Sequence, residues 1–556
     1  MLVLVATVTG QAGRAAPAPE AQGEVAALAV ERAGHEARGG HGVRFTPCPE
    51  NASLDCGTVA VPIDYGRPDG PWMGIAVIRA RTTNPAARIG VLVGNPGGPG
   101  VSGVDFVLGI ADAPPVAPLR ARFDIVSFDP RGVKRSGQVR CDFDRGTFPD
   151  ASDDAALADY FDELGRRRAD ACFSQNGPHI GYLGTANVAR DLDMIRRALG
   201  EARITYAAGS YGSELGATYA SLFPERVRAM MLDGGIAPSF VDYNVESWST
   251  YALGFELSFQ RLEQVCRRDP ACPLSGPGVV PVLDAVLARL RVAPVTGPGG
   301  LVLSAARLQD IVAALLGSER NWPLIVRALA AAAVGDDAVL LQLLPLVTGE
   351  PLHALLPIWC SDHGTRRPAA DILRVDEAVG ALTPRFFGRF FVADLVAACS
   401  AWPPADSPRI KDVSRRMATP ILILANDFDP NTPMIDARAM AQALGMEHSL
   451  LRYEGGGHTA FFKGIACIDE AARAYLIDRT LPPPGSSCPA MPVSFGPGAS
   501  GRTGVSAEPC RWTPASGTPR QCASRVHDAG SREHIVSPWR AHRMFGRCRC
   551  RPSRPQ

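Results

Sequence analysis

Residues 202–220 read ARITYAAGSYGSELGATYA, which is a short apolar segment, an abrupt turn of small residues and the start of a helical pattern. This order of strand, tight turn and helix is the local structure that lifts a serine hydroxyl above the edge of a parallel sheet. The turn needs small residues two positions before and two positions after the serine. Around Ser210 these positions hold Ala208 and Gly212, whereas around Ser213 both are bulky. Ser210 is therefore the predicted nucleophile, although Ala208 departs from the usual glycine.

Two later apolar segments supply partners for this serine. A serine is a weak nucleophile unless a base accepts its proton and a carboxylate orients that base. The segment ILILANDFDPNTP contains Asp427 and Asp429, and LLRYEGGGHTA contains His458, in the chain order serine, acid, histidine. We predict His458 as the base and Asp429 as its carboxylate, with Asp427 as the substitute. The alternatives are a surface-loop histidine and an aspartate that only forms a turn.

A glycine-rich loop supplies the third part of the predicted site. A tetrahedral intermediate needs backbone N–H donors for its oxyanion, and one of them is the N–H of the residue after the nucleophile, Tyr211. The loop GNPGGPG at residues 94–100 follows an earlier apolar segment and supplies the second, for which we predict Gly98, with Gly97 close behind. A phosphate-binding role is excluded because the loop lacks both G-K-[ST] and the G-x-G-x-x-G spacing.

The segments around these motifs alternate between strand and helix patterns. IGVLVGNPGGPG and FDIVSFDPRGVKRSG are apolar runs that end in turns, which is typical of strands buried on both faces. Thr185 to Leu199 carries its apolar residues at helical spacing. From about Phe240 to Trp402 the strand pattern stops and the apolar stripes are helical. These patterns predict an α/β fold with a mostly parallel central sheet and an inserted helical cap domain.

We predict five segments along the 556 residues. They are a leader or signal-like segment with a linker (1–43), the first part of the α/β core (44–240), the helical cap insertion (241–405), the C-terminal part of the core (406–489) and a basic tail (490–556). The tail is rich in Gly, Pro and Ser, carries eleven arginines and lacks apolar periodicity. We predict that it is disordered because it cannot bury enough surface to offset its ordering entropy. A basic arm for nucleic acid is the alternative.

Composition excludes few classes of partner. The chain is 46% hydrophobic and 20% charged, and its net charge of +1 gives no reason to expect nucleic acid or an anionic membrane as a partner. No apolar run approaches the roughly 20 residues that span a bilayer. The start MLVLVATV and the small residues at 16–18 are typical of the end of a secretory signal, although the basic region that opens such signals is missing.

Cysteine spacing points to an oxidising compartment. Ten of the 14 cysteines fall into local pairs without the C-x-x-C doublets of a zinc site. The pairs are Cys48 with Cys56, Cys141 with Cys172, Cys266 with Cys272, Cys360 with Cys399, and Cys467 with Cys488. We predict disulfides and an exported protein, with buried free thiols as the alternative.

Several motifs in one order resemble a known family. P-G-G-P-G at 96–100, D-P-R-G at 129–132, S-Y-G-S-E-L-G-A-T-Y-A at 210–220 and D-P-N-T-P at 429–433 together resemble the secreted tripeptidyl aminopeptidases of actinobacteria, in the proline-iminopeptidase branch of the α/β-hydrolases. The resemblance covers about residues 44–489. It implies an α/β-hydrolase fold, cleavage of peptides from a free N-terminus and no cofactor or metal.

The same resemblance assigns roles to single residues. It implies that Ser210 is the nucleophile, Asp429 the acid and His458 the base, and that Asp129 and Arg131 form a structural turn. Ala208 departs from the family at the first glycine of the turn, and Ala237 stands where the family often has an acid.

Two other classes of function stay open at this point. An esterase or another small-molecule acyl hydrolase is the alternative enzyme, because the same groups serve esters. A binding protein without catalysis is the third class, and the complete set of catalytic groups argues against it. An aminopeptidase must also hold a substrate ammonium group. Glu214, Glu246 and Glu256 are candidates for that role, but each also fits a solvated helix position, so the residues that bind substrate are not assigned.

Overall fold

The computed structural model describes residues 42–143, 153–237, 245–348, 353–362, 366–383, 385–386, 391–403, 420–446 and 449–496. Nearly all of the predicted leader and the tail from residue 497 onward lie outside these ranges. The boundaries predicted near residues 240 and 405 also lie outside the described ranges, so the division of the chain into five segments stays a prediction.

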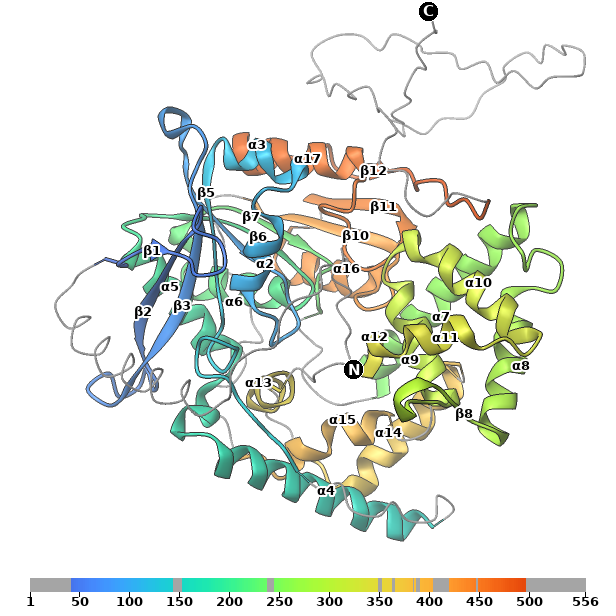
Figure 1. Ribbon diagram of the computed structural model, residues 1–556. Helices are drawn as coiled ribbons and strands as arrows, with labels where there is room; N and C mark the ends of the chain where they lie inside the picture. The colour runs from blue at the N-terminus through green and yellow to red at the C-terminus, as the bar shows by residue number, and fades with distance from the viewer. Residues whose placement is uncertain are drawn as a thin grey trace, which may run out of the picture. The chain divides into compact units, whose positions relative to one another are not determined.

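A ten-stranded sheet forms the centre of the described chain (Figure 1). Its strand order is β1-β2-β3-β5-β4-β6-β7-β10-β11-β12. The first three strands pair antiparallel and all strands from β5 to β12 pair parallel. The strands are β1 (Thr46–Pro47), β2 (Asp55–Pro62), β3 (Trp72–Ala80), β4 (Gly90–Asn95), β5 (Phe123–Phe128), β6 (Ile204–Gly209), β7 (Val227–Asp233), β10 (Leu422–Phe428), β11 (Leu450–Gly456) and β12 (Ser487–Cys488). The predicted α/β class with a mostly parallel sheet is confirmed.

Helices cover both faces of the sheet. The chain forms α2 (Gly103–Ile110), α3 (Ala117–Arg120), α4 (Asp154–Gln175), α5 (Thr185–Ala198), α6 (Tyr211–Leu222), α16 (Met434–Ala443) and α17 (Ala466–Asp478) outside the cap region. Apolar residues of α5, α6 and α16 share one buried cluster with the sheet, and those of α2, α3 and α17 share another. Strands β4 and β5 are buried along their whole length, as expected for strands covered on both faces.

A third core holds the cap helices together. These are α7 (Val245–Arg268), α8 (Val279–Val292), α9 (Ala305–Leu316), α10 (Trp322–Ala333), α11 (Ala338–Leu343), α12 (Pro345–Thr348), α13 (Leu355–Asp362), α14 (Ala369–Leu382) and α15 (Phe391–Ser400), with a small hairpin of β8 (Val295–Thr296) and β9 (Val302–Leu303). Helix α4, which precedes β6 in the chain, packs against α14 and α15 in the same core (Figure 1). The cap is therefore built from more of the chain than the insertion after β7.

All five predicted disulfides form in the described chain. They join Cys48 to Cys56, Cys141 to Cys172, Cys266 to Cys272, Cys360 to Cys399 and Cys467 to Cys488. The four cysteines in the C-terminal tail lie outside the described residues. Among the helices of the described chain, none combines the length and the apolar character needed to cross a bilayer.

Candidate active site

Ser210 sits in a strained turn between β6 and α6. Its φ is 56° and its ψ is −130°. Residues other than glycine rarely adopt a positive φ, and those that do are often found at functional sites. Its backbone N–H donates to the carbonyl of Asp233 at the end of β7 (2.8 Å). The sequence predicted this turn from the strand, the small residues and the helix. The geometry is that of a nucleophile elbow.

The structure explains how the elbow tolerates alanine at position 208. A Cβ on Gly212 would lie 2.7 Å from the Cβ of Ala208 and 3.0 Å from the backbone oxygen of Asn95. The methyl group of Ala208 thus occupies the space between strand and helix, and this space is open because residue 212 has no side chain. A single extra carbon is accommodated at the strand position only while the helix position stays glycine.

Ser213 does not line the pocket at Ser210. Its side chain is fully buried, donates to the carbonyl of Gly234 (3.3 Å) and accepts from the N–H of Ile236 (3.1 Å). These bonds hold the segment that follows β7. The predicted preference for Ser210 over Ser213 agrees with this placement.

Asp429 and His458 come together at the ends of β10 and β11. The His458 Nδ1 atom lies 2.9 Å from Asp429 Oδ1 and 3.2 Å from Oδ2. Asp429 is buried, and its carboxylate also accepts from the backbone N–H groups of Asn431, Thr432 and Thr459 at 2.8–3.1 Å. Burial raises the pKa of Asp429, but the charge of His458 and these hydrogen bonds outweigh it, so the pKa is lowered overall.

Asp427, the predicted substitute, points to another partner. Its Oδ1 accepts from Arg452 Nε at 2.7 Å in a partly exposed ion pair. Of the two aspartates, only Asp429 contacts His458 in the described chain.

Two polar residues that the sequence reasoning missed support this pair. Thr432 Oγ1 donates to Asp429 Oδ2 (3.0 Å) and lies 3.3 Å from His458 Nδ1. Asp233 is buried at the end of β7 and accepts from the N–H groups of Ala460 and Phe461, just after His458 (2.7–3.1 Å). Burial raises the pKa of Asp233 to about 6. Asp233 ends β7 and Thr432 follows β10, but nothing in the local sequence of either residue indicates a contact with the histidine loop.

The nitrogen of His458 that faces away from Asp429 has no partner. The Nε2 atom is buried and makes no hydrogen bond within the described residues, and no hydrogen bond joins it to Ser210. The two loops do approach each other, because a Cβ on Gly209 would lie 3.2 Å from Thr459 Cγ2. Hydrogen bonds between catalytic groups are often long before substrate binds. Of the two ring nitrogens of His458, Nδ1 contacts Asp429 and Nε2 is left without a partner among the described residues.

The 94–100 loop lies directly against the elbow. A Cβ on Gly97 would meet the Gly209 carbonyl oxygen at 2.6 Å and the Tyr211 backbone nitrogen at 3.3 Å. The Gly97 N–H is already bonded to Asn95 Oδ1 (2.9 Å). Gly98 lines the same pocket as Ser210 and Tyr211, and its N–H stays the predicted second oxyanion donor.

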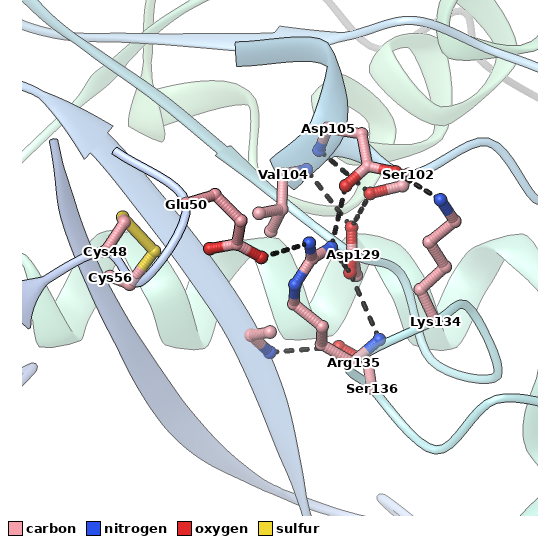
Figure 2. A network of polar contacts seen from close by, with 11 residues as sticks. Cys48, Glu50, Cys56, Ser102, Val104, Asp105, Asp129, Lys134, Arg135 and Ser136 are labelled. Carbon is pink, nitrogen blue, oxygen red and sulfur yellow. Dashed lines mark hydrogen bonds and ion pairs between the residues drawn. A yellow bond between two sulfur atoms is a disulfide. The ribbon is translucent and has the colours of Figure 1, made fainter. Parts of the chain in front are cut away.

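The D-P-R-G turn braces the base of this loop. Asp129 is fully buried and accepts from Ser102 Oγ (2.5 Å) and from the N–H of Val104 (3.1 Å), which anchors the start of α2 directly after the loop. Figure 2 shows this contact together with Arg135, which bonds Glu50 (2.7 Å) and reaches Asp129 (3.4 Å). The predicted structural role of Asp129 agrees with these contacts.

Arg131 of the same turn is also fully buried. Its guanidinium group makes two bonds to Asp191 (2.7 and 2.6 Å) and further bonds to three backbone carbonyl groups. These contacts join the turn to β2 and α5 and leave Arg131 no free donor edge for substrate.

A pocket opens in front of Ser210. Its lining residues are Gly98, Pro99, Ser210, Tyr211, Glu214, Ile236, Tyr251, Trp359, Asp362, Asn431, Thr432 and Asp436. Core loops and the cap helices α7 and α13 contribute together. Of the three predicted ammonium-binding candidates, Glu214 lines this pocket, whereas Glu256 faces Arg385 (3.4 Å). The side chain of Glu246 lies outside the described part of the structure. Ala237 is buried next to the pocket residue Ile236.

Within the described ranges, no group of three or more His, Cys, Asp or Glu side chains is arranged to hold a metal ion. The site brings together a serine in a strained turn, an aspartate–histidine pair and a glycine-rich loop, which are the kinds of group that acyl transfer by a serine uses.

Sequence comparisons agree with this class. The family described as alpha/beta hydrolase fold matches residues 90–277, and the family described as TAP-like protein matches residues 384–488. With its strand order, elbow and glycine-rich loop, the protein is a hydrolase of the α/β-hydrolase superfamily.

Three curated relatives match most of the chain. Serine protease Hip1 of Mycobacterium tuberculosis is 32% identical over 489 residues, covering 81% of this chain and 91% of that protein. Carboxylesterase B of the same species is 34% identical over 456 residues, covering 78% and 86%. Tripeptidyl aminopeptidase of Streptomyces lividans is 28% identical over 483 residues, covering 82% and 87%. The chain belongs to the TAP-like family of α/β-hydrolases, to which the sequence motifs had pointed.

Proposed function

We propose that the protein is a serine exopeptidase that cleaves peptides from a free N-terminus. The observation that supports this proposal is that the turn holding Ser210 lies against the loop of His458, since a Cβ on Gly209 would be 3.2 Å from Thr459 Cγ2, while the pocket at Ser210 also holds three carboxyl groups. The similarity to the tripeptidyl aminopeptidase of Streptomyces lividans and to serine protease Hip1 supports a peptidase function.

The proposed reaction has two steps. Ser210 Oγ attacks the scissile carbonyl carbon while His458 Nε2 takes the hydroxyl proton and Asp429 holds the resulting imidazolium. The N–H groups of Tyr211 and Gly98 stabilise the oxyanion. The C–N bond then breaks, His458 returns the proton to the leaving amine, and an ester to Ser210 remains. Water attacks this ester with His458 again as base, which releases the acid and restores the serine.

A second enzyme class has a specific observation in its favour. Carboxylesterase B matches this chain at 34% identity, and the same nucleophile and oxyanion donors serve esters and amides alike. Esterase activity on small substrates is therefore the alternative function.

The deciding experiment compares a free tripeptidyl p-nitroanilide, its N-acetylated counterpart and a short p-nitrophenyl ester. We expect the free peptide to be cleaved with the highest kcat/KM. Ser210→Ala should lower kcat by about 10⁴-fold or more, whereas the matched control Ser213→Ala should keep most of the activity. Equal turnover of free and blocked peptides would contradict the exopeptidase proposal, and turnover of the ester alone would favour the esterase.

We also propose that the protein is exported, because the five disulfides are stable in an oxidising compartment. Recovery of the mature protein from the cytosol with reduced cysteines would contradict this location.

A further inference from the structure

The pocket at Ser210 contains carboxyl groups that the proposed reaction does not use. Glu214, Asp362 and Asp436 line it together with the apolar side chains of Ile236 and Trp359. Carboxylates are costly to bury without a cation or hydrogen-bond donors. Each of the three therefore needs a partner, either in the protein or in the substrate.

Asp362 has its partner in the protein. Its oxygens accept from the backbone N–H of Thr185 (2.7 Å) and from Thr185 Oγ1 (2.6 Å) at the start of α5. Thr185 Oγ1 in turn lies 2.5 Å from the hydroxyl of Tyr211. These hydrogen bonds connect α13 to the start of α5 and to Tyr211, the residue after Ser210. Asp362 therefore has a structural role.

Asp436 has no such partner. It is 8% exposed, and its side chain makes no hydrogen bond or ion pair with any residue of the described chain. Burial and the nearby charge of Asp429 raise the pKa of Asp436 to about 7. A side chain that is nine-tenths buried, unpaired and facing a pocket beside a nucleophile is placed to receive a positively charged group from the substrate.

We propose that Asp436 binds the protonated α-amino group of the peptide substrate. The proposal rests on the proposed exopeptidase function and assigns its substrate recognition to one residue. An ammonium group supplies three donors and one positive charge, which satisfy the buried carboxylate. Tyr251 and Trp359 line the same pocket, and aromatic rings close to a bound cation also favour it. Because Ser210 and Asp436 line one pocket, the α-amino group of the substrate is only a few residues of the peptide away from the bond that is cut.

Another aspartate of the chain serves as a matched control for a purely structural role of Asp436. Asp436 is the third residue of α16, whose N-cap is Pro433, and its N–H bonds the carbonyl of Pro433 (2.8 Å). Asp371 is likewise the third residue of α14, with Pro368 as N-cap and an N–H bond to that carbonyl (3.0 Å). Asp371 lies at the surface in an ion pair with Arg374. Any general effect of an acid at a helix start should appear in both variants.

The experiment measures kcat and KM of the full chain for a free tripeptidyl p-nitroanilide, its N-acetylated form and a short p-nitrophenyl ester. Asp436→Asn should lower kcat/KM for the free peptide by about 10- to 100-fold, mainly through KM, the range expected for losing a hydrogen bond to a charged group. Turnover of the ester and of the blocked peptide should stay within about twofold of wild type, and Asp371→Asn should behave as wild type. If Asp436→Asn does not fold, Asp436→Glu moves the charge by one carbon and gives the same comparison.

The outcomes separate the two proposals. If the wild-type enzyme shows no preference for a free amine, the exopeptidase function fails, whatever the variant does. If the wild type prefers a free amine and Asp436→Asn keeps that preference, or if Glu214→Gln loses it instead, only the assignment to Asp436 is overturned. An equal loss on all three substrates also overturns it.

Discussion

At neutral pH and above, Asp436 carries a charge that costs the folded protein free energy. Its pKa in the fold is raised to about 7 because the carboxyl group is buried and lies close to Asp429. Its ordinary value is 3.8. The unfolded chain therefore loses this proton at lower pH than the folded chain does. The group favours folding below the unfolded pKa, and this contribution is lost as the pH rises through about 7.

We predict that Asp436→Asn stabilises the protein at pH 8 but not at pH 4. The shift of about three pKa units sets an upper limit of about 4 kcal/mol for the gain at pH 8. The groups that share its pocket or shift its pKa are Asp429, Glu214, Asp362, Tyr211 and Tyr251. Denaturant unfolding of variant and wild type at both pH values gives the measurement, and a variant that is less stable at pH 8 would contradict this account. A residue that costs stability and is needed for substrate binding is a known form of trade-off.

At this scale the sequence predicted the residues whose roles depend on local spacing. Ser210, Asp429 and His458 each follow a strand and sit in a recognisable turn, so their places could be read from short segments. Asp436 could not be selected, because its burial depends on pocket walls supplied by Tyr251 and Trp359, from helices far away in the sequence. Its own surroundings, a helix start after proline, look the same as those of the partly exposed Asp371.

Among the elements, the turn between α9 and α10 makes an unusual connection to the core. Glu319 accepts from the N–H of Gly456 (2.8 Å) and from the hydroxyl of Tyr453 (2.9 Å) at the end of β11. The carbonyl of Gly317 accepts from the N–H of His458 (2.9 Å). A short cap segment thus holds the strand and the loop that carry the predicted base.

We predict that Glu319→Ala lowers kcat by about tenfold and reduces stability by about 1–3 kcal/mol, because it leaves the Gly456 N–H and the Tyr453 hydroxyl without their acceptor. KM for the free peptide should change little, since Glu319 does not line the pocket. Glu319→Gln keeps one amide oxygen and should recover part of kcat. Glu377→Ala, at an exposed position of α14, is the control, and an unchanged kcat in Glu319→Ala would refute the coupling.

The elements themselves could be predicted from periodicity. The helix expected over 185–199 is α5, Thr185–Ala198, and the expected strands appear as β4, β5, β6, β10 and β11. The reason for the glycines before His458 could not be predicted from periodicity. A Cβ on Gly456 would meet the ring of Trp322 at 2.8 Å, so this glycine makes room for a cap side chain and does more than let the loop bend inward. Only a contact between distant segments reveals this.

For the whole molecule, two of the disulfides lie within the cap core. Cys360 and Cys399 join α13 to α15 across 39 residues, whereas Cys266 in the last turn of α7 is joined to Cys272 across 6 residues. All four cysteines are buried. Removing either pair therefore leaves a similar change in packing, and the two pairs differ mainly in the length of chain that they close.

We predict that Cys360→Ala with Cys399→Ala costs about 4 kcal/mol of stability and that Cys266→Ala with Cys272→Ala costs about 2 kcal/mol, following loop-closure entropy. Thermal or denaturant unfolding of the two double variants gives the comparison. The reverse ranking would show that strain or packing decides these contributions in place of chain entropy.

At this scale the sequence predicted the α/β core and the disulfide pairs, because both follow from local spacing. The composition of the cap was less accessible. Helix α4 lies between β5 and β6 in the chain, where a core helix is expected, yet its apolar face packs against α14 and α15. The amphipathic pattern of a helix shows that one face is buried, but not which partner buries it.

The bond from Gly317 to His458 also bears on how substrate enters and product leaves. If the helical cap opened, the turn after α9 would move away from β11. This motion would break the hydrogen bonds that Gly317 and Glu319 make with β11 and the His458 loop. Such an opening would therefore also disturb His458, the predicted base. The contacts that cap opening would break are thus the same contacts that hold the His458 loop, so a substrate that enters without opening the cap leaves this loop in place.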